Sequence, residues 1–250
     1  MQANQVLGID IGGSGIKGAV VDLNTGELVT ERMRLLTPQP AVPKAVAETV
    51  KELVKKIGWE GKPIGCGFPA IIQHGVAKSA ANIDDAWIGT NAAQLLTKAT
   101  GCPVAVLNDA DAAGFAEMRF GVGMDEDGVA MLITIGTGLG SALFMDGQLV
   151  PNTEFGHLKF KGDIAENYAS NRIRKEHDLS WQEWGNRFNV YLKHLERLFT
   201  PDLIILGGGV SKKHEKFSKY IDAEARVIPA KLLNNAGIVG AAMYAHEKLI

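Results

Sequence analysis

The sequence predicts an α/β protein built from two similar halves. Apolar segments with strand-like and helix-like periodicity alternate along the chain, which is typical of this class. A pair of strand-like segments near the start is echoed by a second pair over 129–135 and 139–144. In each half, a glycine-rich segment directly follows an apolar, β-rich run. These observations predict the fold class.

The first half is expected to begin with a strand hairpin and to continue with alternating helices and strands. The second strand of the hairpin ends in a turn at Asn24-Thr25-Gly26. Apolar residues recur at helical spacing from Val42 to Ile57, and Gly58 is placed to end that helix. The next expected elements are a strand over 64–67, a helix over 91–99 that stops at Gly101, a buried strand over 103–107 and a helix over 111–120.

The second half restarts with the strand pair, and a turn is expected at Asp146-Gly147. Ser180 and Glu183 form a capping box that opens a helix. The apolar face of that helix is expected to belong to the core rather than to a ligand site, and it carries Trp184, Phe188, Leu192, Leu195 and Phe199. A buried strand over 203–206 and a closing helix over 236–249 complete this half.

Composition limits the function classes to which the chain can belong. Its 250 residues are 46% hydrophobic, enough for two lobes or one large domain. The net charge of -2 gives no global attraction for nucleic acid, so any polyanion would need a local basic patch. Cys66 and Cys102 form no disulfide framework and are expected to be buried and reduced. Without a basic leader or an apolar run of about 18 residues, a cytoplasmic protein without membrane contact is expected.

Two glycine-rich segments are candidates for phosphate binding. They are Asp10-Ile11-Gly12-Gly13-Ser14-Gly15-Ile16-Lys17 and Thr134-Ile135-Gly136-Thr137-Gly138-Leu139-Gly140. Each places glycines and a Ser or Thr where a strand turns, so that backbone N–H groups can face phosphate oxygens. Asp10 adds a carboxylate of the kind that holds Mg²⁺, directly or through water. An ordinary glycine-rich hairpin is the alternative for either segment alone.

The common nucleotide-binding motifs do not account for these segments. Residues 13–18 fit G-x-G-x-x-G, but a dinucleotide-binding loop must open a helix, and residues 19–23 are strand-like. The G-x-x-x-x-G-K-[ST] motif does not occur in the sequence. A Rossmann dinucleotide site and a P-loop NTPase are therefore not expected.

Five motifs in a fixed order give the chain a resemblance to a known family. They are D-I-G-G followed by a strand with Lys17, L-N-D-A-D-A-A from Leu107, I-T-I-G-T-G-L-G from Ile133, E-F-G-H from Glu154 and L-G-G-G from Leu206. In this order they resemble the sugar kinases of the ROK family, over nearly the whole chain. The short length and the missing cysteine cluster are most similar to the actinobacterial polyphosphate glucokinases and glucomannokinases.

The resemblance implies a two-lobed actin/hexokinase-like fold, related to ribonuclease H, with the active site in the cleft between the lobes. It implies a small N-terminal lobe over 1–112, against which the closing helix 236–249 packs back. Residues 113–250 would form the large C-terminal lobe. A homodimer is the expected assembly in this family.

Asp109 is the candidate catalytic residue. A sugar hydroxyl is a poor nucleophile, so a kinase benefits from a carboxylate that accepts its proton. Asp109 matches the general base of the family's N-D-A segment. A structural cap for the following helix is the alternative role. Asp111 is the rival carboxylate and is interpreted as a helix first-turn charge.

The resemblance also supplies candidate sugar-binding residues, since hydroxyl groups are recognised by several polar side chains. The residues implied are Asn82, Asn108, Asp109, Glu154, His157 and Glu166. His157 could instead be a buried structural histidine. Most family members carry a cysteine-bound zinc after E-x-G-H, whereas this chain runs from Leu158 to Ala165 without cysteine. No zinc site is therefore expected, and the orientation of His157 is open.

The phosphoryl donor is expected at the glycine-rich segments. The resemblance implies phosphate binding by Asp10, Gly12, Gly13, Ser14, Lys17, Gly136, Thr137 and Gly138. It implies that Gly207, Gly208 and Gly209 lie on the nucleotide or polyphosphate side. Two basic runs are added to that side by their charge, and they contain Arg172, Arg174, Lys175, Lys212, Lys213 and Lys216. If both runs line one groove they suit a linear polyanion; otherwise they are solvated surface.

The implied function is Mg²⁺-dependent phosphorylation of the 6-hydroxyl of glucose, with mannose as a further candidate sugar, by inorganic polyphosphate and ATP. An ATP-only ROK hexokinase is the nearest alternative. A sugar-responsive regulator needs an N-terminal helix-turn-helix, for which a first strand near Gln5 leaves no room. A noncatalytic sugar-sensing protein is disfavoured because Asp10, Lys17 and Asp109 are all present.

Overall fold

The computed structural model describes residues 4–80 and 82–250 of the chain. These form two compact units, Met1–Phe120 with Asn235–Ile250, and Gly121–Asn234. The division expected after residue 112 falls inside helix α3 (Asp109–Phe120), which belongs wholly to the first unit. It does so because α3 packs along the closing helix α8 (Ala236–Leu249) over its length. The lobe limits implied by the resemblance stay a prediction.

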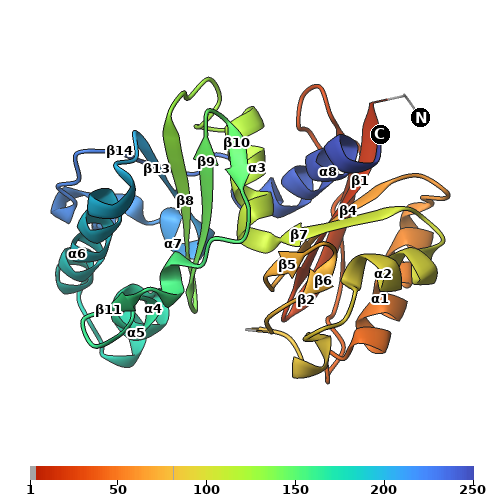
Figure 1. The fold of residues 1–250 in the computed structure, drawn as a ribbon, viewed down its shortest axis with the longest axis horizontal. Helices are drawn as coiled ribbons and strands as arrows, with labels where there is room; N and C mark the ends of the chain where they lie inside the picture. Colours follow the sequence, from red (N-terminus) through yellow and green to blue (C-terminus); the bar gives the residue numbers. More distant parts are fainter. Residues whose placement is uncertain (1–3, 81) are drawn as a thin grey trace. The chain divides into compact units, whose positions relative to one another are not determined.

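The first unit contains a five-stranded mixed sheet in the order β3-β2-β1-β4-β7 (Figure 1). The strands are β1 (Gln5–Gly12), β2 (Gly15–Asp22), β3 (Met33–Leu35), β4 (Ile64–Phe68) and β7 (Val104–Asn108). Strands β3, β2 and β1 are antiparallel, and β1, β4 and β7 are parallel. A small ladder pairs β5 (Ile72–Gln73) with β6 (Val76–Ala77).

The second unit repeats this plan with the sheet order β10-β9-β8-β13-β14. Its strands are β8 (Val129–Ile135), β9 (Leu139–Met145), β10 (Gln148–Val150), β13 (Leu203–Gly207) and β14 (Arg226–Pro229). Again β9 is antiparallel to its neighbours β10 and β8, and β13 and β14 run parallel to β8. The predicted echo between the two halves is confirmed. The turn at Asp146-Gly147 leads from β9 into β10, whereas residues 136–138 join β8 to β9.

Local sequence signals explain where the longer helices begin and end. Helix α1 (Pro43–Ile57) stops at Gly58, whose φ of 74° suits glycine. Helix α2 (Ala92–Thr100) starts at the Asn91 cap and stops at Gly101. The predicted capping box of Ser180 and Glu183 opens α6 (Trp181–Phe199). Shorter elements are α4 (Glu166–Ala169), α5 (Asn171–Glu176), α7 (Gly208–Ser211), β11 (Lys159–Phe160), β12 (Asp163–Ile164) and the 3₁₀ turns Asp85–Trp87, Phe155–His157, His214–Lys216, Ser218–Tyr220 and Leu233–Asn235.

The apolar face of α6 belongs to the core of the second unit, as predicted. Trp184, Phe188, Leu192 and Leu195 are fully buried, and Phe199 packs against them half-buried. The indole of Trp184 donates to the carbonyls of Ala169 and Ser170, so its polar atom is also satisfied. In the first unit, Cys66 and Cys102 are free, buried thiols, and burial raises the pKa of Cys66. No helix within the described ranges 4–80 and 82–250 is both long and apolar enough to cross a bilayer.

Helix α8 packs against β1 and β4 of the first sheet (Figure 1). The approach is so close that glycine is required at the contacts. A Cβ atom added at Gly8 of β1 would lie 1.9 Å from the carbonyl oxygen of Ile238. At Gly65 of β4 it would lie 1.7 Å from the carbonyl oxygen of Ala241. Neither oxygen is the end of a flexible side chain, so a larger residue would force the helix away from the strand.

We expect Gly65→Ala to lower the free energy of unfolding by about 1–3 kcal/mol or more, because an added methyl group overpacks a backbone contact. Gly67→Ala on the same strand is the matched control, since its Cβ would meet Ala112 at an ordinary 3.4 Å. Chemical denaturation of both variants measures the difference. Equal stability of the two variants would contradict the close packing of α8.

Candidate active-site residues

The first glycine-rich segment forms the turn between β1 and β2. Gly12 and Gly15 face each other across this hairpin, with Gly13 and Ser14 at its exposed tip. Asp10 and Lys17 are directly opposed on the two strands, and Lys17 Nζ lies 2.9 Å from Asp10 Oδ2. Both side chains are half-buried. The hairpin therefore presents a carboxylate and an ammonium group beside bare backbone, as the phosphate-binding interpretation requires.

Three side chains hold the carbonyl groups of this turn, and sequence patterns did not indicate them. Thr37 Oγ1 donates to the Gly12 carbonyl, Gln39 Nε2 to the Gly13 carbonyl and Arg34 Nη2 to the Ser14 carbonyl. They lie in and just after β3, a strand that the hydrophobic pattern does not predict. The one feature of the sequence that could have indicated these three residues is that they follow the first hairpin closely in the chain.

Asn108 and Asp109 lie at the carboxyl end of β7, where the chain turns into α3. Asn108 is buried, and its side-chain oxygen accepts from the backbone N–H groups of Ala110 and Asp111. Its amide donates to the Ala70 carbonyl. Asn108 thus caps α3, so the helix starts two residues earlier than the expected Asp111.

Asp109 is exposed at the first position of α3. Its Oδ1 lies 2.8 Å from the backbone N–H of Ala110, which also donates to Asn108. Because Asn108 supplies the cap, helix capping does not by itself explain the carboxylate at position 109. Asp111 lies in the first turn as interpreted, but it is buried with 1% exposure.

Asn82 belongs to the segment that touches the first glycine turn. Its side chain is exposed, and a Cβ at Gly13 would lie 2.9 Å from the Asn82 carbonyl oxygen. Trp87, five residues later, is fully buried against Phe68 and donates its indole N–H to the Ala41 carbonyl. Trp87 therefore anchors the segment that carries Asn82.

In the second unit, both remaining glycine-rich segments follow neighbouring parallel strands. Gly207 pairs in register with Thr134, so the segments after β13 and β8 leave the same edge of the sheet. A Cβ at Gly208 would lie 2.6–3.0 Å from backbone atoms of Ile135. Thr137 is exposed at the tip of the turn. The two segments are therefore side by side, as a shared phosphate site would need.

Glu154, His157 and Glu166 form a cluster beside the turn at residues 136–138. His157 Nδ1 lies 3.4 Å from a Glu154 oxygen and Nε2 lies 3.9 Å from a Glu166 oxygen. Glu166 Oε2 accepts from the Leu139 N–H at 3.2 Å, and a Cβ at Gly138 would lie 2.4 Å from it. Burial raises the pKa of Glu154; nearby His157 opposes this and Glu166 adds to it. The imidazole is half exposed rather than a buried core group.

A short hairpin joins His157 to Glu166 across the segment where the sequence left the orientation of His157 open. Strands β11 and β12 pair antiparallel around Lys161 and Gly162, whose φ angles of 54° and 90° fit a tight two-residue loop. The Ala165 N–H donates to the Leu158 carbonyl at 2.9 Å and closes the base. Phe160 is buried and packs against Tyr168, Tyr191 and His194.

The two basic runs meet at one tryptophan. The Arg174 guanidinium lies 4.3 Å from the ring centre of Trp181, and Lys216 Nζ lies 6.0 Å from it. Lys175, Lys212 and Lys213 are exposed. Arg172 is different, because it pairs with Glu176 and donates to Asn167. One cation from each run, Arg174 and Lys216, thus lies against the same ring, and Arg172 is partly neutralised.

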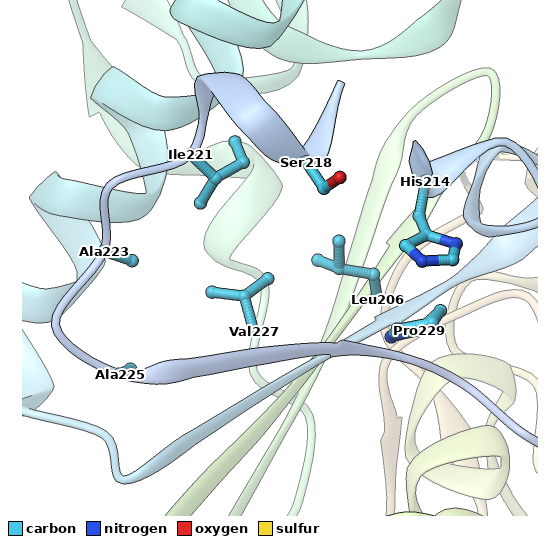
Figure 2. Close-up of a pocket in the computed structure, with 8 residues that line it drawn as sticks. All are labelled: Leu206, His214, Ser218, Ile221, Ala223, Ala225, Val227 and Pro229. Atoms are coloured by element: carbon cyan, nitrogen blue, oxygen red, sulfur yellow. The ribbon is translucent and has the colours of Figure 1, made fainter. Parts of the chain in front are cut away.

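A separate pocket lies beside the third glycine-rich segment (Figure 2). It has a volume of about 200 Å³ and is lined by Leu206, His214, Ser218, Ile221, Ala223, Ala225, Val227 and Pro229. His214 and Ser218 supply its polar side chains, and the rest of the lining is apolar. None of the described residues that line this pocket is a lysine or an arginine, so its chemistry differs from that of the basic surface.

Asp10 is the residue that fits the expected magnesium ion. In the part of the chain that the structure describes, no three His, Cys, Asp or Glu side chains cluster in a way suited to a metal ion. Magnesium needs no such cluster, since it keeps several waters and takes further oxygens from substrate phosphates. One half-buried carboxylate beside a glycine turn is compatible with that mode of binding.

Known proteins share both the sequence and the fold of this chain. Polyphosphate glucokinase from Mycobacterium tuberculosis is 48% identical over 94% of this chain and 89% of its own length. A polyphosphate/ATP-glucomannokinase structure from Arthrobacter sp. strain KM is 48% identical, covers 98% of this chain and 99% of its own, and has a TM-score of 0.92.

A ROK glucokinase from Streptomyces griseus, in complex with glucose and AMPPNP, is 26% identical, with coverages of 97% and 99% and a TM-score of 0.82. These likenesses confirm the expected actin/hexokinase-like fold class. The family model described as ROK family matches residues 6–171. Together these matches establish that the chain belongs to the ROK family.

Proposed function

We propose that this chain is a glucokinase that transfers phosphate from inorganic polyphosphate, and from ATP as a second donor, to the 6-hydroxyl of glucose. The observation that carries the chemistry is Asp109, an exposed carboxylate at the carboxyl end of β7 whose capping role is taken by Asn108. The likeness at 48% to a polyphosphate glucokinase supports the choice of sugar and donor.

In this proposal Asp109 accepts the proton of the sugar hydroxyl as the bond to phosphorus forms. A general base must be ionised and within hydrogen-bond reach of the proton that it takes. The exposure of Asp109 leaves its carboxylate accessible to a substrate hydroxyl. The buried Asp111 in the same first turn of α3 is not accessible in this way.

Sugar recognition is assigned to Asn82, Asn108, Glu154, His157 and Glu166. Within the second unit, the carboxylates of Glu154 and Glu166 flank both ring nitrogens of His157. Such a cluster offers acceptors and a donor at fixed spacing to adjacent hydroxyl groups, which apolar walls cannot distinguish. Asn108 already uses its side chain in the α3 cap, so its sugar contact is the least supported. Mannose is proposed as a second sugar.

Donor binding is assigned to the glycine turns and their charged neighbours. The backbone N–H groups of Gly12, Gly13, Gly136 and Gly138, with Ser14, Thr137 and Lys17, would stabilise charge on the transferred phosphoryl group. Magnesium held at Asp10 would neutralise the phosphate oxygens when bound. We also propose a cytoplasmic, homodimeric enzyme, on the strength of the resemblance.

Two surfaces of the second unit support two donors of different chemistry. The cations around Trp181 suit a linear polyphosphate, because each of its units carries about one negative charge. The mainly apolar pocket beside residues 207–209 suits a nucleobase better than a polyphosphate, because its lining contains no lysine or arginine among the described residues. An ATP-only hexokinase would leave the basic surface without a role.

Replacement of Asp109 tests the assigned base. Asp109→Asn should lower kcat by at least about 10²-fold while leaving the fold and glucose binding almost unchanged. Asp111→Asn is the control, with kcat expected to stay within a few fold. Steady-state rates and glucose binding by calorimetry measure both variants. A kcat for Asp109→Asn close to wild type would exclude Asp109 as the base.

Salt dependence tests the donor assignment. The KM for polyphosphate should rise steeply with salt because several counterions are released on binding, and ATP should show a shallower slope. The double variant Lys212→Gln, Lys213→Gln should raise the KM for polyphosphate much more than that for ATP and leave the KM for glucose unchanged.

Ala223→Phe, which fills the apolar pocket, is the reciprocal control and should raise the KM for ATP only. Initial rates with both donors over a salt series give all of these values. If polyphosphate supports no phosphorylation of glucose, or if the two salt slopes are equal, the ATP-only hexokinase is the better assignment.

Metal removal tests the cofactor assignment. EDTA should abolish activity and added Mg²⁺ should restore it, because the phosphates of the donor need a divalent ion. Zinc should play no part, because the segment 158–165 carries no cysteine that could bind it. Elemental analysis of the purified protein is expected to find no stoichiometric zinc. A content of about one zinc per chain would overturn this assignment.

A further inference from the structure

Arg34 continues a row of charged residues across the first sheet. The register pairs Asp10 of β1 with Lys17 of β2, and Lys17 with Arg34 of β3. Directly opposed residues of neighbouring strands point to the same face of a sheet. The three side chains therefore share one face, next to the glycine turn that ends β1.

The Arg34 side chain packs directly against the backbone of the glycine turn at Gly15. A Cβ atom at Gly15 would lie 2.4 Å from Arg34 Nε and 3.1 Å from the carbon of the guanidinium. Only a glycine at position 15 therefore lets the guanidinium lie against the backbone. Arg34 Nη2 donates to the Ser14 carbonyl at 3.0 Å, which fixes the group beside the tip of the turn.

The two cations of this row differ in how their charge is balanced. Lys17 is paired with Asp10 at 2.9 Å. Among residues 4–80 and 82–250, no ion pair joins Arg34 to a carboxylate, and its side chain is exposed. A guanidinium has five N–H donors in a planar fork that matches the oxygens of a phosphate. Arg34 therefore brings an unbalanced, anchored positive charge to the turn.

We infer that Arg34 binds a phosphate oxyanion of the donor at the turn formed by residues 12–15. This inference rests on the proposed function of that turn and adds to it a cation that the family motifs do not contain. Lys17 and Arg34 would then both attract the same anion from one face of the sheet, while the carboxylate of Asp10 balances the charge of Lys17. The bound group is a phosphate common to polyphosphate and ATP, so both donors should depend on it.

A purely structural role is the competing explanation, because Arg34 also tethers the Ser14 carbonyl. Thr37 provides the comparison, since it tethers the Gly12 carbonyl without a charge. Arg34→Gln removes the charge and keeps an N–H donor, Arg34→Lys keeps the charge, and Thr37→Val removes a tether only. Lys44→Gln, an exposed cation at the start of α1, controls for net charge.

The primary measurement is the binding of inorganic tripolyphosphate by calorimetry over a salt series, without sugar. Arg34→Gln should weaken binding by at least about tenfold and reduce the salt slope by about one, and Arg34→Lys should recover much of the loss. In steady-state assays the KM for both donors should rise, with the KM for glucose unchanged. Thermal unfolding establishes that each variant is folded.

The inference is overturned if Arg34→Gln binds tripolyphosphate like Lys44→Gln, or if Thr37→Val reproduces its loss of affinity and of salt slope. It is also overturned if the wild-type protein binds no tripolyphosphate. If Arg34→Gln does not fold, Arg34→Lys must still differ from wild type in donor affinity and match it in salt slope. Failure of the proposed function gives a different result, namely tripolyphosphate binding that depends on Arg34 without transfer to any sugar.

Discussion

The close contact between α8 and the sheet of the first unit is the constraint on which the placement of its carboxylates depends. Gly8 and Gly65 let the helix backbone touch β1 and β4, and a Cβ at Gly240 would lie 1.7 Å from the Ala112 carbonyl of α3. The strand that ends near Asp10 and the helix that begins at Asp109 are therefore both packed on one helix. A Cβ at Gly237 would already press on Asp10 at 3.3 Å, so the helix also limits where that carboxylate can lie.

Much of the fold could be predicted from the sequence because its signals are local. Gly58 and Gly101 end their helices in the left-handed conformation that favours glycine, and Ser180 with Glu183 makes the capping box. The start of α3 was predicted two residues late. The reason is that Asn108 belongs at once to the end of a strand and to a helix cap, and the hydrophobic pattern records only the strand.

The candidate site was predicted unevenly, since motifs identify residues but not their long-range partners. The pairing of Asp10 with Lys17 follows from the hairpin, whereas the row reaches Arg34 only through the register of β2 with β3. The short strand β3 has no clear pattern of its own, and the tethers from Thr37 and Gln39 depend on how the chain after it folds back. The meeting of two basic runs at Trp181 also joins segments that are distant in sequence.

In the hairpin between His157 and Glu166, one buried aromatic side chain, Phe160, fixes the segment that carries the two polar residues. Its base is closed by one backbone hydrogen bond, and its loop is fixed by Lys161 and Gly162. Burial of one large apolar side chain contributes about 1.5–3 kcal/mol, whereas fixing the backbone of each residue costs about 1–2 kcal/mol, so this burial offsets the ordering of only one or two residues and favours a short loop. Phe160 supplies that burial at the middle of the hairpin, so the ends that carry the imidazole and the carboxylate are held by packing on α6. No cysteine ligand is needed in this segment to bring the two groups within 3.9 Å of each other.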